Sequence, residues 1–534
     1  MKGSSVALPG LPGLEFVSST GGTTMRLYLI NPRNPLVSMT RIRESHWNRY
    51  RVWKPLGLAT VAALTPPDWD TNIFDENIVV PDHSALPRPD LVGITAFTSQ
   101  APRAYEIAAE YRRHGVPVVM GGIHATMCSE EAMAHVDAVV TGEAERMWTQ
   151  VLADVQHGAL QLRYDGVHAD MAEIPPARHD LLTGDYAFAS IQTTRGCPLN
   201  CSFCSVTAFN GYRYRLRPVA HVVQEFKTIP EKLVLVVDDN LIGTGHGHVT
   251  RAKDLFRAMI RARLRKRWIA QVTINFADDD ELLMLAAKAG CVGVFIGFES
   301  PTAEGLMEVG KKFNMLNGRD FPASVRRIQQ HKILVAGSFI MGLDTDEPGI
   351  GRRIAEAGTR YGIDVLNTLF LTPLPGTQLW TEMKSQHRLV ADSFPEDWQY
   401  YTLTFPVAQY QHLSCHDILS EMEACETAFF SLSSISRRVW RTVRHWRRPF
   451  VALVANLSYR SNIRLGHADC RTFMLSRGLP HDEPPENKAE GASRSARCRD
   501  DGRNRTEATP RGCSQLMSVA SHDNKRRSCD CLTE

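Results

Sequence analysis

Three cysteines, Cys197, Cys201 and Cys204, lie within the stretch RGCPLNCSFCSV in a C-x3-C-x2-C spacing. A structural zinc site would need a fourth Cys or His at motif spacing, and the nearest histidines, His179 and His221, fall outside this loop. A dithiol redox site would need only C-x-x-C and would leave the third thiol without a role. Three thiolates suit an iron–sulfur cluster that keeps one iron open for an outside ligand. We therefore favour a cluster over three unrelated thiols.

The remainder of the chain has an ordinary globular composition, with 43% apolar and 22% charged residues, which is enough to build packed cores. Its 534 residues exceed what one core holds, so we expect two or three domains. The net charge of +3 is close to balance and gives no reason to expect a nucleic-acid partner. Twelve cysteines in so long a chain do not form a disulfide framework, and no apolar run reaches the length of a membrane span. We therefore expect a reducing, cytoplasmic setting.

The chain from residue 25 to about 155 alternates short apolar runs with helical patterns. This alternation predicts an α/β fold with a doubly wound, flavodoxin-like parallel sheet, which binds its ligand beyond the carboxyl ends of the strands. The expected strands are residues 25–31, 71–77, 90–97, 117–122 and 137–142, and the expected helices are residues 56–64, 101–115 and 145–158.

A second alternating segment, at residues 185–382, predicts a partial, TIM-like (β/α)6 barrel. The three cysteines follow its first expected strand, so they lie at a carboxyl end, where α/β barrels carry their chemistry. The expected strands are residues 188–194, 232–240, 267–275, 293–300, 333–342 and 364–373.

The flanking segments lack this alternation. The expected organisation is a flexible leader at residues 1–24, a linker at 156–184, a mostly helical region at 383–480 and a disordered tail at 481–534. The tail is polar and rich in Gly, Ser and Arg, so it has few apolar side chains to bury.

The cysteine spacing, with the aromatic Phe203 before the last cysteine, resembles the signature of the radical S-adenosylmethionine (SAM) enzymes. The resemblance covers roughly residues 185 to 380. It implies that Cys197, Cys201 and Cys204 hold a [4Fe-4S] cluster whose remaining iron binds SAM. It also implies an external one-electron reductant, such as flavodoxin or ferredoxin, that drives cleavage of SAM to a 5′-deoxyadenosyl radical.

Later segments fall where this family places its SAM contacts, at the ends of the second, fourth, fifth and sixth expected strands of the barrel. Each also has a simpler interpretation, because aspartates can cap helices and a glutamate can precede one. The sequence departs from the Gly-Gly-Glu that is common in the family at the second strand. The residues that the resemblance assigns to SAM are Phe203, Asp238, Asp239, Asn240, Glu299, Ser300, Gly337 and Gly342, with the Thr372–Thr377 segment closing the sixth strand.

The expected N-terminal sheet carries small residues at its strand ends. Gly121 and Gly122 would let the backbone approach a bulky planar ligand, and Thr95, Thr98 and Ser99 would supply hydroxyl groups. GGIHAT followed by DAVVTGEAE resembles the cobalamin-binding domain of one branch of the radical SAM enzymes. That branch also includes hopanoid methylases and the anaerobic ring-forming enzyme of bacteriochlorophyll synthesis. The alternative is an empty flavodoxin-like scaffold that only docks the barrel.

The Asp-x-His-x-x-Gly motif, whose histidine ligates cobalt in methionine synthase, is absent. His46 does not lie in the expected frame, and we interpret His124 as a pocket or surface residue and not as a ligand. We therefore expect cobalamin without a histidine ligand from the protein.

A basic segment at residues 437–448 carries six arginines, Trp440 and Trp446, and no acidic residue. Such a segment can make peripheral contact with an anionic membrane or hold an acidic, amphiphilic substrate. It can equally be a solvated basic face that packs through its tryptophans.

These resemblances imply a cobalamin-dependent radical SAM enzyme that methylates an unactivated carbon of a small or amphiphilic substrate. An oxidative cyclase or rearranging enzyme with the same cofactors stays open, as does a non-catalytic cobalamin or iron–sulfur sensor. A methylthiotransferase acting on RNA is disfavoured, since that group has three more N-terminal cysteines and only Cys128 is available here.

Overall fold

The computed structural model describes residues 24–479, apart from 38–40, 42–43, 45–47, 49–51 and 445–447. The expected leader up to residue 23, the tail from 480 onward, His46 and Trp446 lie outside the described residues. All elements below belong to one compact unit, Met1–His481.

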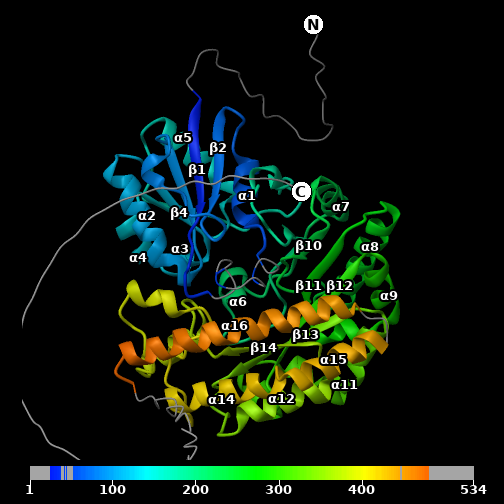
Figure 1. Ribbon diagram of the computed structural model, residues 1–534. Helices are drawn as coiled ribbons and strands as arrows, with labels where there is room; N and C mark the ends of the chain where they lie inside the picture. Colours follow the sequence, from blue (N-terminus) through cyan, green and yellow to red (C-terminus); the bar gives the residue numbers. More distant parts are fainter. Residues whose placement is uncertain are drawn as a thin grey trace, which may run out of the picture. The chain divides into compact units, whose positions relative to one another are not determined.

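The first sheet has six parallel strands in the order β2-β1-β3-β4-β5-β6 (Figure 1). The strand order reverses next to β1, as in doubly wound folds, and confirms the expected flavodoxin-like class. The strands are β1 (Met25–Asn31), β2 (Trp69–Asp75), β3 (Leu91–Thr95), β4 (Val118–Gly121), β5 (Ala138–Thr141) and β6 (Arg163–Asp165). Its main helices are α1 (Leu56–Leu64), α2 (Ala101–Arg113), α3 (Gly122–Met127), α4 (Ser129–His135) and α5 (Trp148–Gln156).

The second sheet has six parallel strands in sequential order, β7-β10-β11-β12-β13-β14, with a helix after each of the inner strands (Figure 1). No described strand joins β14 back to β7, so the sheet is the open barrel that the sequence predicted. The strands are β7 (Ala189–Ile191), β10 (Leu233–Val236), β11 (Arg267–Val272), β12 (Cys291–Glu299), β13 (Leu334–Met341) and β14 (Val365–Phe370). The helices include α6 (Ser205–Asn210), α7 (Val219–Thr228), α8 (His246–Arg261), α9 (Asp280–Lys288), α10 (Ala303–Glu308), α11 (Phe321–Gln330) and α12 (Ile350–Tyr361).

The barrel strands are apolar on both faces, as parallel strands covered by helices must be. Phe256 and Trp268 stack in the layer between this sheet and its helices, with ring centroids 5.3 Å apart. Burial of these large rings supplies much of the free energy that holds the sheet in place.

The C-terminal region is mostly helical, with α13 (Gln378–Ser385), α14 (Cys415–Phe429), α15 (Leu432–Arg444) and α16 (Pro449–Ser476). Helix α16 contacts α15 and β14 at its amino end, where Asn456 donates to the backbone oxygen of Asp364. Near its carboxyl end Asp469 forms an ion pair with Arg41, and Phe473 is buried in the same apolar cluster as β1 and β3 of the first sheet. Among the helices of the described residues, none combines the length and the apolar character needed to cross a bilayer.

Candidate cofactor site

The cysteine loop lies between the short strand β8 (Thr194–Arg195) and helix α6. Gly196 adopts a φ of +84°, and a β-carbon there would collide with the backbone oxygen of Arg213, so the turn requires glycine. The backbone N–H of Gly196 donates to Asp239, at 2.9 Å, and that of Cys204 donates to the oxygen of Cys201, at 3.1 Å. The loop is therefore held in one conformation at the carboxyl ends of β7 and β10.

Burial raises the pKa of all three thiols, that of Cys201 to about 12, and the charge of Lys311 partly offsets this. Among the described residues, no three His, Cys, Asp or Glu side chains are close enough to hold a single metal ion. In an iron–sulfur cluster each thiolate binds a different iron, so the sulfur atoms stay further apart than around one ion. The donor set, three shielded thiols on a fixed loop, fits a cluster.

The three polar residues after β10 have different roles. Asp238 is buried and accepts hydrogen bonds from the backbone and hydroxyl of Thr193, at 2.5 and 2.6 Å, so it fastens β10 to β7. Burial raises the pKa of Asp238, and raises that of Asp239 to about 6. Asn240 donates to the sulfur of Cys197, at 3.9 Å, and to Thr273. Asp239 and Asn240 therefore contact the cysteine loop directly, whereas Asp238 supports it from behind.

Glu299, at the end of β12, has a φ of +65°, which is unusual for a residue with a side chain. Its Oε1 accepts a hydrogen bond from Lys311 Nζ, at 2.7 Å, and both side chains are about nine-tenths buried. Sequence reasoning identified Glu299 but missed Lys311, because nothing in the local sequence around Lys311 distinguishes it from a surface lysine.

The remaining residues assigned to SAM lie in packed positions. Ser300 is fully buried and bonded to the hydroxyl of Thr302, and Phe203 packs against the barrel core. At Gly337 a β-carbon would lie 2.9 Å from Ile363, so this glycine faces the layer between sheet and helices. Gly342 has a φ of +100°, and a β-carbon there would lie 2.5 Å from the ring of Tyr410.

The sixth-strand segment reaches the cysteine loop through α13. Thr377 caps this helix by accepting from the N–H of Trp380, at 3.1 Å. Leu379, in its first turn, donates its backbone N–H to the oxygen of Ser202, also at 3.1 Å. The Thr372–Thr377 segment therefore closes onto the residues between the second and third cysteines.

The carboxyl edge of the first sheet is lined by small residues. Gly122 has a φ of +92°, and a β-carbon there would lie 2.6 Å from the hydroxyl of Thr95 and 3.2 Å from the backbone of Ala96. Gly121 lies in extended backbone beside it, and Thr98 and Ser99 form the single turn that follows β3. The ends of β3 and β4 therefore carry only small side chains, and the backbone of Gly122 packs directly against Thr95 and Ala96.

His124 is fully buried, so of the two expected alternatives, a pocket residue or a surface residue, the second is wrong. Its Nε2 lies 2.9 Å from the hydroxyl of Tyr105 and 3.3 Å from Glu131, which also accepts from the indole of Trp398. The histidine is thereby occupied in joining α2, α3 and α4 to the C-terminal region.

The carboxyl ends of the two sheets are joined by ion pairs. Glu143, just after β5, is buried and pairs with Arg195 at 3.1 Å and with Arg215 at 3.0 Å, and Glu145 pairs with Arg195 at 2.5 Å. Arg195 directly precedes the cysteine loop, and helix α6, which follows the loop, contacts α3. The loop that carries the thiols is therefore attached to the strand ends of the first sheet.

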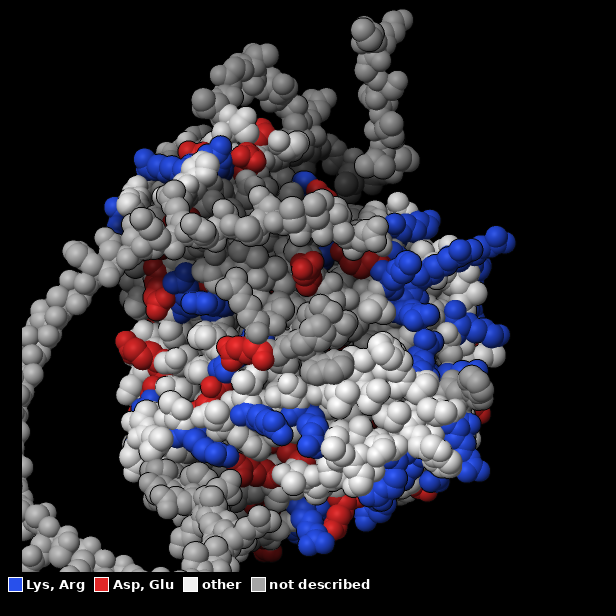
Figure 2. Space-filling view, in the orientation of Figure 1, with Lys and Arg blue, Asp and Glu red and all other residues white. Residues whose placement is uncertain are grey.

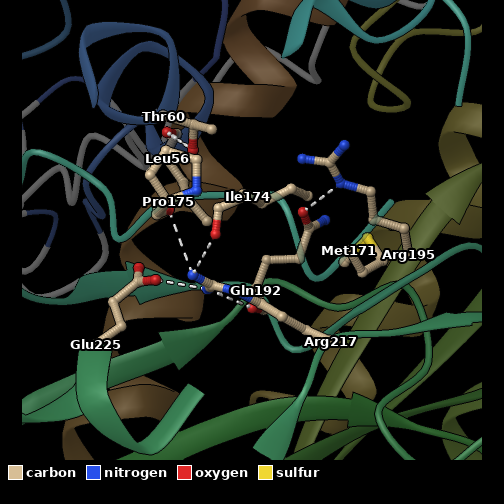
Figure 3. A pocket seen from close by; sticks show the side chains of 9 residues that line it. All are labelled: Leu56, Thr60, Met171, Ile174, Pro175, Gln192, Arg195, Arg217 and Glu225. Atoms are coloured by element: carbon tan, nitrogen blue, oxygen red, sulfur yellow. Dashed lines mark hydrogen bonds and ion pairs between the residues drawn. The ribbon is translucent and has the colours of Figure 1, made fainter. Parts of the chain in front are cut away.

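A cavity of about 10 Å³ lies beside Arg195, where Gln192 accepts from its Nε and Arg217 pairs with Glu225 at 2.5 Å (Figure 3). It holds one water molecule at most. A second cavity of about 780 Å³ lies at the amino ends of β4 and β5, beside Pro117 and Asp137, on the side of the sheet opposite to the cysteine loop. Neither of these two cavities is lined by the three cysteines or by a residue assigned to SAM or cobalamin.

Comparisons with known proteins match both halves of this arrangement. Residues 48–152 match the B12 binding domain model, and residues 191–351 match the Radical SAM superfamily model. The chain is 27% identical to bacteriochlorophyllide d C-12(1)-methyltransferase of Chlorobaculum tepidum, over 82% of this chain and 94% of that protein. It is 29% identical to bacteriochlorophyllide d C-8(2)-methyltransferase of the same organism, over 65% of this chain and 80% of that protein.

A solved structure shares the fold. The radical SAM methyltransferase TsrM of Kitasatospora setae, with cobalamin and a [4Fe-4S] cluster bound, superposes with a TM-score of 0.55 over 68% of this chain and 75% of that one. The two sequences are 20% identical.

Proposed function

Because the chain belongs to the radical SAM enzymes that carry a B12-binding domain, we propose that it methylates an unactivated carbon of an amphiphilic small molecule. Its cofactors are a [4Fe-4S] cluster, SAM and cobalamin. When bound, they supply a transferable methyl group and a 5′-deoxyadenosyl radical, chemistry that no side chain provides. The observation that carries the proposal is the three-cysteine loop joined by ion pairs to the strand ends of the B12-binding domain.

We assign the cluster to Cys197, Cys201 and Cys204. Cys201 is buried and Cys197 and Cys204 are partly buried, and Asp239 and Asn240 hold the loop from the side of β10. Cysteine binds iron as the thiolate, so each thiol would give up its proton when the cluster is inserted. Of the residues assigned to SAM, Asp239 and Asn240 contact the cysteine loop, and Glu299 binds Lys311. Gly337 instead lies in the packed layer between the sheet and its helices.

We assign the corrin ring to the edge formed by Thr95, Thr98, Ser99, Gly121 and Gly122. Gly122 must be glycine because Thr95 and Ala96 occupy the space that a β-carbon would need, and this lets α3 begin directly against the end of β3. His124 is fully buried and its Nε2 is engaged by Tyr105 and Glu131, so we assign it no bond to cobalt, although its Nδ1 has no hydrogen-bond partner among the described residues.

The amphiphilic substrate is supported by two observations. Two relatives matched over most of their length are named for methylation of bacteriochlorophyllide d. The chain also exposes a basic–aromatic patch, which comprises Leu432, Arg437, Trp440, Arg441, Val443, Arg444 and Phe450. Figure 2 shows uncharged surface over the adjoining ends of α15 and α16, bordered by blue side chains. Trp440 is 58% exposed and Phe450 75% exposed. Arg444 lies over the ring of Trp440, and Arg437 donates to the backbone oxygen of Ser433.

We propose that this patch makes peripheral contact with anionic lipid in the cytoplasm. Sedimentation with vesicles tests this. The protein should bind vesicles that contain phosphatidylglycerol more tightly than vesicles of phosphatidylcholine, and the double variant Arg437→Glu/Arg441→Glu should lose that preference. Equal binding to both vesicles would contradict the proposal.

The reaction itself is tested with anaerobically reconstituted protein, SAM and a one-electron donor such as reduced flavodoxin. We expect 5′-deoxyadenosine to form, and label from methyl-labelled SAM to enter a carbon of an amphiphilic acceptor such as a chlorophyllide. Deoxyadenosine with an unlabelled, ring-closed product would favour a cyclase. Absence of deoxyadenosine from cluster-loaded protein would favour a sensor.

A further inference from the structure

Lys311 lies in the loop after α10, packed against the cysteine loop. The preceding Gly310 has a φ of +71°, and a β-carbon there would lie 2.7 Å from the oxygen of Asn200 and 3.8 Å from the α-carbon of Cys201. Asn314 donates to the oxygen of Gly297, at 3.0 Å, and so holds the other end of this segment on β12. The ammonium group of Lys311 therefore has a fixed position beside the thiols.

The cost of burying this charge is high. Moving an ammonium group and a carboxylate out of water costs several kcal/mol each, and their attraction often fails to recover it. Replacing such a pair by apolar side chains of similar size is often neutral or stabilising. The ion pair is therefore poor evidence for stability.

The ammonium group of Lys311 is close enough to Cys197, Cys201 and Cys204 for its charge to act on each of them. Glu299 Oε1 lies 2.7 Å from this ammonium group. Burial opposes the charge of Lys311, yet the adjacent carboxylate of Glu299 raises its pKa above the usual value.

A positive charge here has a direct electrochemical consequence. An oxidised [4Fe-4S] core carries two positive charges, so three thiolates leave the site with one net negative charge, and one-electron reduction makes it two. A nearby ammonium group in a site of low dielectric stabilises the more negative state. It therefore makes the cluster easier to reduce.

We propose that Lys311, held in place by Glu299, raises the reduction potential of the cluster that the three cysteines bind. In the step concerned, one electron passes from a flavodoxin-type or ferredoxin-type donor to the cluster. No bond forms or breaks, and Lys311 keeps its proton. The inference rests on the proposed cluster site, and it assigns Lys311 a role in the electron-accepting step, before SAM is cleaved.

The test compares full-length wild type with Lys311→Met, Lys311→Arg and Glu299→Gln/Lys311→Met, each reconstituted anaerobically. The double variant removes both charges together, so it leaves no unpaired carboxylate and remains informative if Lys311→Met fails to fold. Iron and sulfide content give the cluster loading, and a redox titration followed by electron paramagnetic resonance, without SAM, gives the midpoint potential.

We expect the midpoint to shift to more negative potential in Lys311→Met and in the double variant, and to stay near the wild-type value in Lys311→Arg. An unchanged midpoint in a fully loaded double variant would overturn the inference. Loss of cluster from the double variant would also overturn it, in favour of a structural role. Weaker SAM binding at an unchanged midpoint would assign Lys311 to the SAM carboxylate instead. Wild-type protein that binds no cluster would refute the proposed function itself.

Discussion

The carboxyl ends of the two sheets differ in their side chains. The barrel end gathers thiols, carboxylates and an ammonium group, whereas the ends of β3 and β4 in the first sheet present glycines and small hydroxyls. A cluster and a SAM molecule need specific ligand atoms, and the site that we assign to them consists of reactive and charged groups. A corrin ring carries its own metal ligands, and the edge that we assign to it consists of small residues. The two ends should therefore respond independently to substitution.

The largest effect is expected at the thiols. Cys201→Ala should abolish the cluster and deoxyadenosine formation but leave corrinoid binding intact, because none of the residues that we assign to the corrin ring is a cysteine. Absorption spectra of reconstituted protein measure both cofactors. Cys415→Ser, at the start of α14 and away from the loop, is the control and should retain both. Loss of both cofactors in Cys201→Ala alone would mean that the two ends are not independent.

Gly122→Val should have the opposite effect, because it should weaken corrinoid binding and leave the cluster in place. A valine at a φ of +92° is strained, and its β-carbon would crowd Thr95, so we expect a loss of about 2–4 kcal/mol in unfolding free energy. Corrinoid affinity should fall at least about tenfold, a loss of about 1.4 kcal/mol or more, while the cluster is retained. Gly57→Ala, in α1 with no atom within 4 Å of the added carbon, should instead stabilise by up to about 1 kcal/mol. Unchanged corrinoid affinity in Gly122→Val would remove this edge from the cofactor site.

Glu143→Gln tests the connection between the two ends. It leaves Arg195 and Arg215 without their buried carboxylate, which should cost about 2–3 kcal/mol of stability. Both cofactors should still bind, but more deoxyadenosine should form per methyl transferred, since the ends are less firmly held together. The exposed pair Glu173–Arg146 provides the control, and Glu173→Gln should change stability by less than about 0.5 kcal/mol. An unchanged product ratio would show that the ion pairs only stabilise.

The smallest effect concerns Asp346, beyond the end of β13, which accepts from the backbone of Gly342 and Leu343. Burial raises the pKa of its carboxyl to about 6. A raised carboxyl pKa makes the folded state prefer the protonated form, so stability is lost as the pH rises from about 4 through 6. Asp346→Asn should flatten this part of the profile and stabilise by about 1 kcal/mol at pH 7.5, as urea unfolding at several pH values would measure. A profile identical to that of the wild type would contradict the pKa assignment.

Most strands could be predicted from the sequence, because parallel strands buried on both faces read as continuous apolar runs. Strand β6 could not, since it is a three-residue edge strand, RYD, whose pairing with β5 depends on the sheet already present. The domain boundaries at residues 155, 184 and 382 remain predictions.

Some residues of the candidate site could likewise be predicted from the sequence, and others could not. The cysteine triad is visible in sequence because the chemistry fixes a local spacing. Lys311 and Glu143 could not be identified in this way. Lys311 pairs with a residue 12 positions away and Glu143 with a residue 72 positions away, and only the fold brings these partners together. Gly337 fell within a segment that resembled the family, but its own environment is set by Ile363 and Phe298 across the helix layer.

Helix α16 connects the barrel to the first sheet. Its 28 residues span about 42 Å, and it is secured to the barrel through Asn456 and to the first sheet through Asp469 and Phe473. Heating should therefore melt the two α/β halves in a single calorimetric transition. A chain that stops at residue 448 should instead show two transitions, because without this helix each half would unfold independently.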